Sequence, residues 1–494
     1  WPHLETLAKE TAGAGKHLHE RLTIYPKYLR DYTRWLDPAL HTKVLHYCDG
    51  QGLPKEDSWV AGQDIEAPAA DLALLSDDAA ELKKYAPVSA DINSLIERAL
   101  RAEALSENEI VRLFSARGSD FAAICRAADQ LRQQRCGNQV SYVVTRNINY
   151  TNVCYFKCQF CAFSKGKLSE NLRGRPYDLS GEEIARRASE AWRRGATEVC
   201  MQGGIHPEYT GQTYIDIVAT LRAATPDMHI HAFSPLEVWQ GAETLGLDLE
   251  TYLQKLKEAG LHTLPGTAAE VLDDEVRAVL CPDKINSEQW LTVMKTAHRV
   301  GLRSTATIMY GHVDGYQSWA RHLLRVRQVQ LETGGFTEFV PLPFVPQEAP
   351  IYLKGKARRG PSFREAILMH AVARLVFNGL IDNIQASWVK MGEQGVEALL
   401  NAGVNDLGGT LMNETITRAA GAVHGQEVAP EQMEARIRRA GRVPFQRNTL
   451  YGPADEQQRQ RSLLAAPLAD IVNTPADKYE RSKLTSDEGL IAIG

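Results

Sequence analysis

The chain has 494 residues, of which 44% are hydrophobic and 24% charged, and its formal net charge is -5 at pH 7. This composition is that of a globular protein with a sizeable core, and it excludes a disordered, collagen-like or disulfide-scaffold chain. With 56 basic and 61 acidic residues, no strong field favours a nucleic acid or an anionic membrane. No apolar run reaches the roughly 18 residues of a membrane-spanning helix, and the first residues carry no signal-peptide pattern. We therefore expect a cytoplasmic protein that acts on small molecules, with no nucleic-acid or membrane partner.

The first part of the chain predicts two units before any catalytic domain. Because the chain begins with Trp1 rather than Met, we expect it to be processed or to be part of a longer protein. Residues 1–75 run into the stretch EAPAADLALLSDDAAELKKYAP, which predicts a linker with a boundary between Gly62 and Ala70. Residues 76–139 carry apolar side chains three or four positions apart, a pattern that predicts a helical preface.

Strand-like and helical segments then alternate through residues 140–390 and a little beyond. Eight segments have the composition of buried strands: SYVVTRNINYTN, ATEVCMQGG, HIHAFSP, HTLPGTAAE, RSTATIMYG, TEFVPLPFV, NIQASWVK and VNDLGGT. Several helices between them end at a glycine where a left-handed cap is expected, namely Gly195, Gly260, Gly301 and Gly379. Eightfold alternation predicts an α/β fold, a (β/α)8 barrel of the TIM type. Residues 391–494 would supply its last element and a C-terminal helical extension.

Three of the eight cysteines lie close together in CYFKCQFC, directly after the first predicted strand. The spacing of Cys154, Cys158 and Cys161 is too tight for a disulfide framework but suits thiolates around a metal. Three thiolates on a [4Fe-4S] cluster leave one iron open to bind S-adenosylmethionine (SAM), and an electron from a reducing donor would then release a 5′-deoxyadenosyl radical. A structural zinc site is the alternative, although closed zinc sites have four ligands and this motif supplies three. The other cysteines are scattered and are expected to be small buried hydrophobes.

Further candidates follow the carboxyl ends of the predicted strands, where barrel active sites lie. In MQGGIHPE, Gln202, Gly203 and Gly204 are candidates for contact with SAM because glycines let a ligand approach the backbone, although most such pairs are turns. In HAFSPLEV, Ser234 and Glu237 are candidates for holding SAM or a substrate amine, and a helix cap is the alternative.

Aromatic and titratable side chains complete the candidate site. Phe160, beside Cys161, is a candidate for contact with the adenine, with core packing as the alternative. Tyr310 is a candidate for cofactor binding. Four residues are candidates for proton transfer or substrate contact: His206, Glu237, Glu270 and His312. A lone histidine is more often structural, so each histidine has that alternative.

These motifs, together with PLPFVPQEAP, IQASWVKMG and NDLGGTLMNE, resemble the CofH-type radical SAM half of FO synthase over roughly residues 95–440. The first seventy residues look like the end of the CofG-type half of fused FO synthases, which implies such a half as a partner in cis or in trans. The resemblance implies transfer of the 4-hydroxybenzyl group of L-tyrosine to 5-amino-6-(D-ribitylamino)uracil in the biosynthesis of the deazaflavin FO. Aminofutalosine synthase and tyrosine-cleaving iminoacetate synthase are alternatives of the same class. A noncatalytic Fe-S or zinc-binding module is an alternative of a different class.

Overall fold

The computed structural model describes residues 2–16, 18–29, 31–76, 78–164, 176–466 and 468. Residues 469–494, the end of the predicted C-terminal extension, lie outside the described residues.

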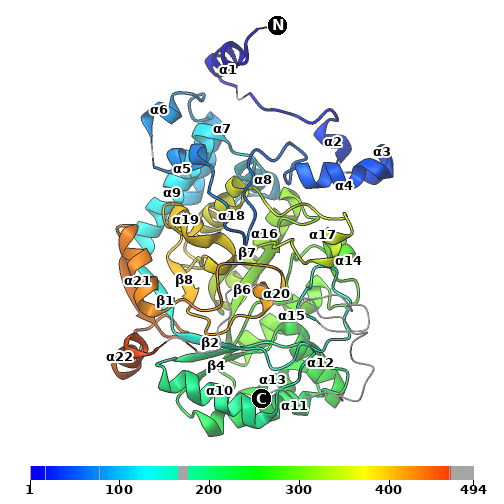
Figure 1. The fold of residues 1–494 in the computed structure, drawn as a ribbon, viewed down its shortest axis with the longest axis vertical. Helices are drawn as coiled ribbons and strands as arrows, with labels where there is room; N and C mark the ends of the chain where they lie inside the picture. Colours follow the sequence, from blue (N-terminus) through cyan, green and yellow to red (C-terminus); the bar gives the residue numbers. More distant parts are fainter. Residues whose placement is uncertain are drawn as a thin grey trace.

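Parallel strands lie at the centre of the molecule (Figure 1). One sheet contains six strands in chain order: β2 (Thr145–Ile148), β3 (Glu198–Met201), β4 (His229–Ala232), β5 (Thr263–Leu264), β6 (Arg303–Tyr310) and β7 (Phe336–Pro343). β1 (Gln139–Val143) runs almost directly into β2 and pairs with β8 (Asp406–Gly409). Parallel bridges from Ile384 to Phe339 and from Gln385 to Asp406 join β7 to β8 and close the ring. The predicted α/β barrel is confirmed, although its seventh strand is reduced to these bridges.

Helices surround this ring. They are α10 (Gly181–Arg193), α11 (Gly211–Ala224), α12 (Pro235–Leu245), α13 (Leu249–Ala259), α14 (Asp274–Leu280), α15 (Ser287–Arg299), α16 (Tyr316–Thr333), α17 (Pro350–Leu353), α18 (Phe363–Val376), α19 (Trp388–Leu400) and α20 (Ile416–Ala419). The left-handed caps predicted at Gly195, Gly260, Gly301 and Gly379 are confirmed, with φ values of 84°, 121°, 84° and 75°. A glycine at these positions avoids the steric cost that a Cβ atom would impose.

The preface and the extension lie against the barrel. The preface contains α7 (Ala90–Leu100), α8 (Glu107–Phe114) and α9 (Gly118–Cys136), and α8 and α9 pack on α18. The stretch predicted as a linker instead contains α5 (Ala69–Leu75) and α6 (Ala79–Leu82), because Leu74 is buried where α5 packs on α9. The extension contains α21 (Pro430–Arg439), β9 (Val443–Arg447) and α22 (Glu456–Leu464), and β9 pairs in parallel with β1.

Burial of the N-terminal segment increases along its length. It contains α1 (Leu4–Gly13), α2 (Pro26–Leu29), α3 (Tyr32–Trp35) and α4 (Pro38–Tyr47). α1 buries no residue and stands apart from the barrel in Figure 1. After α4, by contrast, Trp59, Val60 and Ala61 are buried. Among the described helices, none has the length and apolar character needed to cross a bilayer.

Buried charges attach the segment that follows α4 to the barrel. Arg117 Nη2 donates to Asp49 Oδ2 at 2.7 Å, and Arg364 Nη2 donates to the same oxygen at 3.3 Å. The backbone N–H of Gly50 donates to Glu365 Oε1 at 2.7 Å. Since Arg364 and Glu365 belong to α18, the segment around Asp49 is held by the barrel itself and not only by chain connectivity.

Replacing Arg364 tests this attachment. We expect Arg364→Leu to lower the free energy of unfolding by about 3–5 kcal/mol. The substitution removes a guanidinium that compensates the negative charge of the buried Asp49 carboxylate. Urea-induced unfolding followed by circular dichroism measures the loss. Arg101→Leu is the control, since Arg101 pairs with Glu103 on the surface and its removal should leave the unfolding midpoint nearly unchanged. Equal midpoints for the two variants would contradict the attachment.

Candidate active site

A cavity of about 420 Å³ lies inside the barrel and reaches the loops that follow its strands. Its volume is that of a typical small-molecule site. Most of the residues predicted from the sequence line it: Cys154, Cys158, Phe160, Cys161, Gln202, Gly203, Gly204, Ser234, Glu237 and Glu270. His206, Tyr310 and His312 are not part of this lining.

Backbone hydrogen bonds hold the cysteine loop over the barrel. The N–H of Tyr155 donates to the carbonyl of Ile205 at 3.1 Å, after β3. The N–H of Gln159 donates to the carbonyl of Leu280 at 2.8 Å, at the end of α14. The carbonyl of Gln159 accepts from the N–H of Ile351 at 2.7 Å, after β7. The loop between the first and third cysteines therefore spans the barrel mouth and is fixed from three sides.

The three cysteines have the chemistry that a cluster needs. All are free thiols that line the same cavity. Burial raises the pKa of the Cys154 and Cys158 thiols, and the nearby Lys284 ammonium opposes this rise. In the described part of the chain, no three His, Cys, Asp or Glu side chains are grouped around one ion position. A cubane cluster does not require such a group, because each thiolate binds a different iron. The donor set thus fits a [4Fe-4S] cluster with one iron left open.

Gly203 and Gly204 are required by packing rather than by an unusual backbone. Neither glycine has a positive φ. A Cβ atom on Gly204 would lie 2.2 Å from the carbonyl oxygen of Val153, and one on Gly203 would lie 2.3 Å from the ring of Tyr150. The absent side chains therefore let the start of the cysteine loop lie directly against the end of β3.

Ser234 and Glu237 form the N-terminal cap of α12, which was the alternative interpretation of their motif. Ser234 Oγ accepts from the N–H of Glu237 at 3.3 Å, and Glu237 Oε2 accepts from the N–H of Ser234 at 2.6 Å. The other carboxylate oxygen of Glu237 accepts from the hydroxyl of Tyr150 and, at 3.2 Å, from the N–H of Gly203. Burial raises the pKa of Glu237. This carboxylate ties the start of α12 to the glycine pair while it lines the cavity.

Glu270, Lys284 and Phe160 form a second group beside the cysteine loop. Lys284 Nζ donates to Glu270 Oε1 at 2.9 Å and lies 5.3 Å from the centre of the Phe160 ring. Glu270 has a left-handed backbone, with φ of 45°, as does Ala268, with φ of 61°. Left-handed non-glycine residues are strained and occur often at functional sites. The sequence analysis missed Lys284, which lies on a loop after α14 rather than at a strand end.

Three predicted residues lie elsewhere. His312 is fully buried, with Nε2 3.0 Å from the carbonyl of Met309 and Nδ1 accepting from the N–H of Val313 at 2.7 Å. Burial lowers the pKa of His312, and these two bonds suit a neutral structural imidazole. Tyr310 is fully buried against Trp319. His206 lies beside Tyr209, with ring centres 5.0 Å apart and ring planes tilted by 32°.

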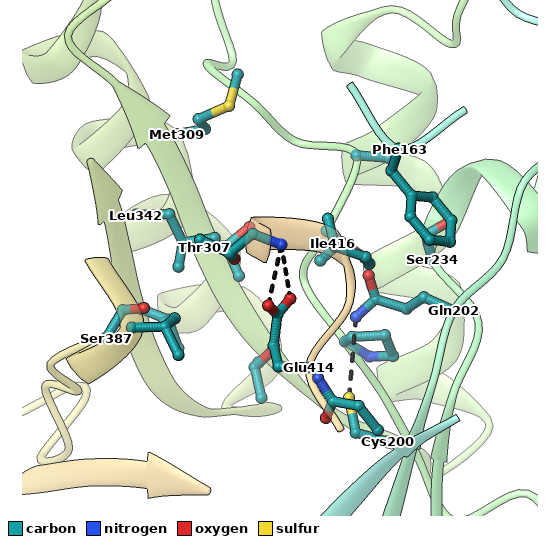
Figure 2. Close-up of a pocket in the computed structure, with 18 of the residues that line it drawn as sticks. Phe163, Cys200, Gln202, Ser234, Thr307, Met309, Leu342, Ser387, Glu414 and Ile416 are labelled. Carbon is teal, nitrogen blue, oxygen red and sulfur yellow. Dashed lines mark hydrogen bonds between the residues drawn. The ribbon is translucent and has the colours of Figure 1, made fainter. Parts of the chain in front are cut away.

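The opposite wall of the cavity carries polar residues that the sequence analysis did not single out. Figure 2 shows Ser387, Leu342 and Thr307 on one side of the cavity and Gln202 and Phe163 on the other. Glu414 accepts two hydrogen bonds from the N–H of Thr417, at 2.8 and 3.0 Å, drawn dashed in Figure 2.

Lys390 completes this wall, and its ammonium forms no hydrogen bond or ion pair with any described residue. Burial lowers the pKa of Lys390 to about 8, and the Glu414 carboxylate opposes this shift. The sequence could have indicated Lys390, because it ends the predicted strand NIQASWVK, which is reduced to the bridges at Ile384 and Gln385. A polar residue at the end of a barrel strand faces the barrel mouth.

Two families match successive parts of the chain. Residues 148–326 match the radical SAM superfamily, and residues 333–460 match the CofH/MqnC C-terminal region. Membership of the radical SAM superfamily implies a [4Fe-4S] cluster and SAM as cofactors, in agreement with the donor set at the barrel mouth.

Solved structures support the fold. A methylornithine synthase matches 71% of the chain with a TM-score of 0.56 at 20% identity, and the hydrogenase maturase HydG matches 76% with a TM-score of 0.57 at 16% identity. The matched regions cover 97% of the methylornithine synthase chain and 80% of the HydG chain.

Curated relatives are closer in sequence. FO synthase of Nocardia farcinica is 43% identical over 92% of this chain, and that of Streptomyces coelicolor is 41% identical over 94%. The chain spans only 57% of the length of each. The 5-amino-6-(D-ribitylamino)uracil–L-tyrosine 4-hydroxyphenyl transferase of Methanocaldococcus jannaschii is 48% identical over 71% of this chain and 97% of its own length. The chain therefore belongs to the radical SAM superfamily and, within it, to the family of this CofH-type transferase.

Proposed function

We propose that this chain joins the 4-hydroxybenzyl group of L-tyrosine to 5-amino-6-(D-ribitylamino)uracil in the biosynthesis of FO. The observation that carries the proposal is the 48% identity to a transferase of that name over 97% of its length. A CofG-type half, in cis or in trans, and a reducing electron donor would complete the system. The presence of FO synthases among the relatives supports this arrangement.

Residues at the barrel mouth would hold the cofactors. Cys154, Cys158 and Cys161 would bind the cluster, and Gly203 and Gly204 offer backbone groups beside it. When bound, the cluster and SAM would supply the radical chemistry that starts with hydrogen abstraction from tyrosine and leads to cleavage of its Cα–Cβ bond. The protein holds the substrates close to this point and keeps water away, since the cavity lies inside the barrel.

Lys390 would bind the carboxylate of tyrosine. Its ammonium lines the cavity without a hydrogen bond or ion pair to any described residue. A partly buried cation without a hydrogen-bond partner loses part of its solvation, and an amino acid carboxylate would supply a partner. Glu414, whose burial raises its pKa, lines the same wall and offers a polar contact for the rest of the amino acid.

Product analysis tests the proposed function. We expect protein reconstituted without oxygen to form the tyrosine–uracil adduct from tyrosine, SAM and 5-amino-6-(D-ribitylamino)uracil, detected by mass spectrometry. Omitting the uracil should abolish the adduct, because the benzyl fragment then lacks its acceptor. Formation of iminoacetate without any adduct would favour the tyrosine-cleaving alternative, and an aminofutalosine product would favour the other one.

The cluster assignment is tested separately. Cys158→Ala should lower the iron content and abolish the release of 5′-deoxyadenosine from SAM under dithionite, because only two thiolates remain. Cys125→Ala is the control, since Cys125 is buried in α9 away from the cavity and should keep both properties. Undiminished SAM cleavage by Cys158→Ala would contradict the assignment.

Lys390 makes a pH-dependent prediction. Lys390→Met should raise the KM for tyrosine roughly tenfold or more, because a charge-assisted hydrogen bond is lost. In the unsubstituted protein this KM should also rise as the pH passes about 8, where the ammonium loses its proton.

Lys390→Arg is the matched control, because its guanidinium stays charged over this range and should flatten the part of the pH dependence that comes from Lys390. The titration of free tyrosine is common to both proteins and cancels in the comparison. Identical pH profiles for the two proteins would remove the proposed role of Lys390.

A further inference from the structure

The interior of this barrel is polar where such barrels are normally filled with apolar side chains. Barrel interiors are usually packed with layers of Val, Ile and Leu. Here the cavity extends inward as far as the first residues of β2 and β3, Thr145 and Glu198. Further polar side chains line this deep end: Asn147, His231, Thr305, Glu338, Gln385, Arg447 and Thr449. We call this end of the cavity, which includes Thr145, Glu198, Glu338 and Thr449, the barrel floor.

Several polar atoms of the floor have no partner within the protein. The hydroxyls of Thr145 and Thr449 are buried, with residue exposures of 2% and 7%, and neither forms a hydrogen bond to a described residue. The side-chain oxygen of Asn147 is also without a partner in the described part of the chain. Glu198 is 6% exposed, and its carboxylate makes neither a hydrogen bond nor an ion pair with any described residue. Buried polar groups are rarely left in this state, so a polar ligand is expected here.

The donor and acceptor pattern restricts the class of that ligand. Glu198 and Glu338 are acceptors. Although Arg447 pairs with Glu338, the floor carries more negative than positive charge, which disfavours a phosphate or a carboxylate. An apolar group would leave the threonine hydroxyls and Glu198 unsatisfied. A chain of hydroxyl groups both donates and accepts, so it can satisfy carboxylates, hydroxyls and an amide oxygen together.

We propose that the barrel floor binds a polyhydroxylated chain, and that this chain is the ribityl group of the uracil substrate. This assignment rests on the proposed function. The cysteines lie at the other end of the same cavity, so the unreactive ribityl chain points away from the cluster and the uracil ring faces the mouth, where the new bond forms. Binding energy from a remote, unreactive group then serves to position the reacting one.

The test compares two uracils in binding and in catalysis. Calorimetry with cluster-loaded protein gives the Kd of 5-amino-6-(D-ribitylamino)uracil and of 5-amino-6-(methylamino)uracil, which lacks the hydroxyls. We expect the protein to prefer the ribityl compound. Glu198→Gln should reduce that preference by roughly 10- to 100-fold, because it removes a charged acceptor, while binding of the methylamino compound stays the same. Thr145→Val removes one hydroxyl at nearly constant shape and should reduce the preference less.

Thr337→Val is the matched control. Thr337 is also a barrel threonine, but it lies outside the cavity lining and donates to the carbonyl of Ser304, so the preference should persist. Two outcomes would overturn the proposal: equal binding of the two uracils by the unsubstituted protein, or a preference that is unchanged in both Glu198→Gln and Thr145→Val. In either case water would be the ligand of the floor. If Glu198→Gln does not fold, Thr145→Val decides.

The outcome for the proposed function can be separated from the outcome for the floor. A ribityl preference that depends on Glu198, found in protein that makes no adduct with tyrosine, would support the floor and contradict the proposed function. Adduct formation with equal use of both uracils would support the function and overturn the floor.

Discussion

The position of the cysteine loop is the constraint on which the rest of the site depends. The loop has no regular secondary structure, so its backbone groups need partners from elsewhere. Those partners are Ile205 after β3, Leu280 at the end of α14 and Ile351 after β7. These three are main-chain hydrogen bonds, and a fourth joins the N–H of Lys157 to Asp283 Oδ2 at 2.9 Å, so the cysteines are placed mainly by the geometry of the closed barrel. A change in how the strands close would move the thiols relative to every other wall of the cavity.

Close packing and strained backbone enforce this position at the strand ends. Gly204 lies against the carbonyl of Val153, and Gly203 lies against the ring of Tyr150. Phe233, at the end of β4, has φ of 64°, and Glu270, after β5, has φ of 45°. Such conformations cost free energy for residues with a Cβ and persist only where the surroundings determine them. The strain lies at the face that carries the cysteines, where a fixed geometry matters most.

Position along a strand was enough to place several predicted residues on the cavity wall. The carboxyl ends of parallel strands meet at one face, so Gly203, Ser234 and Glu270 could be expected near the cysteines. The same rule placed Tyr310 near them, yet on β6 the residues lining the cavity are Thr305, Thr307 and Met309, and alternation turns Tyr310 outward. A one-residue difference in register separates the core from the cavity, and composition alone does not reveal it.

Two features depend on contacts between distant segments and could not be predicted in this way. The stretch predicted as a linker contains α5 because Leu74 finds a buried position in the tertiary structure. The polar floor was missed because each of its strands, taken singly, has the composition of an ordinary buried strand. Only the closed ring brings Thr145, Glu198 and Glu338 around one cavity.

The C-terminal extension makes a polar barrel floor possible. Carboxylates buried without compensation would destabilise the barrel. Arg447, which ends β9, donates to Asp406 Oδ2 at 2.6 Å and lies 3.4 Å from Glu338 Oε2. The pKa of Arg447 is raised by the nearby carboxylates of Asp406 and Glu338 despite its burial, so it remains a cation there. β9 is held in place by its pairing with β1, so an element outside the eight-stranded ring supplies the positive charge for two carboxylates inside it. Glu198 lies outside this ion network. The extension therefore compensates part of the negative charge of a barrel interior that stays hollow and polar.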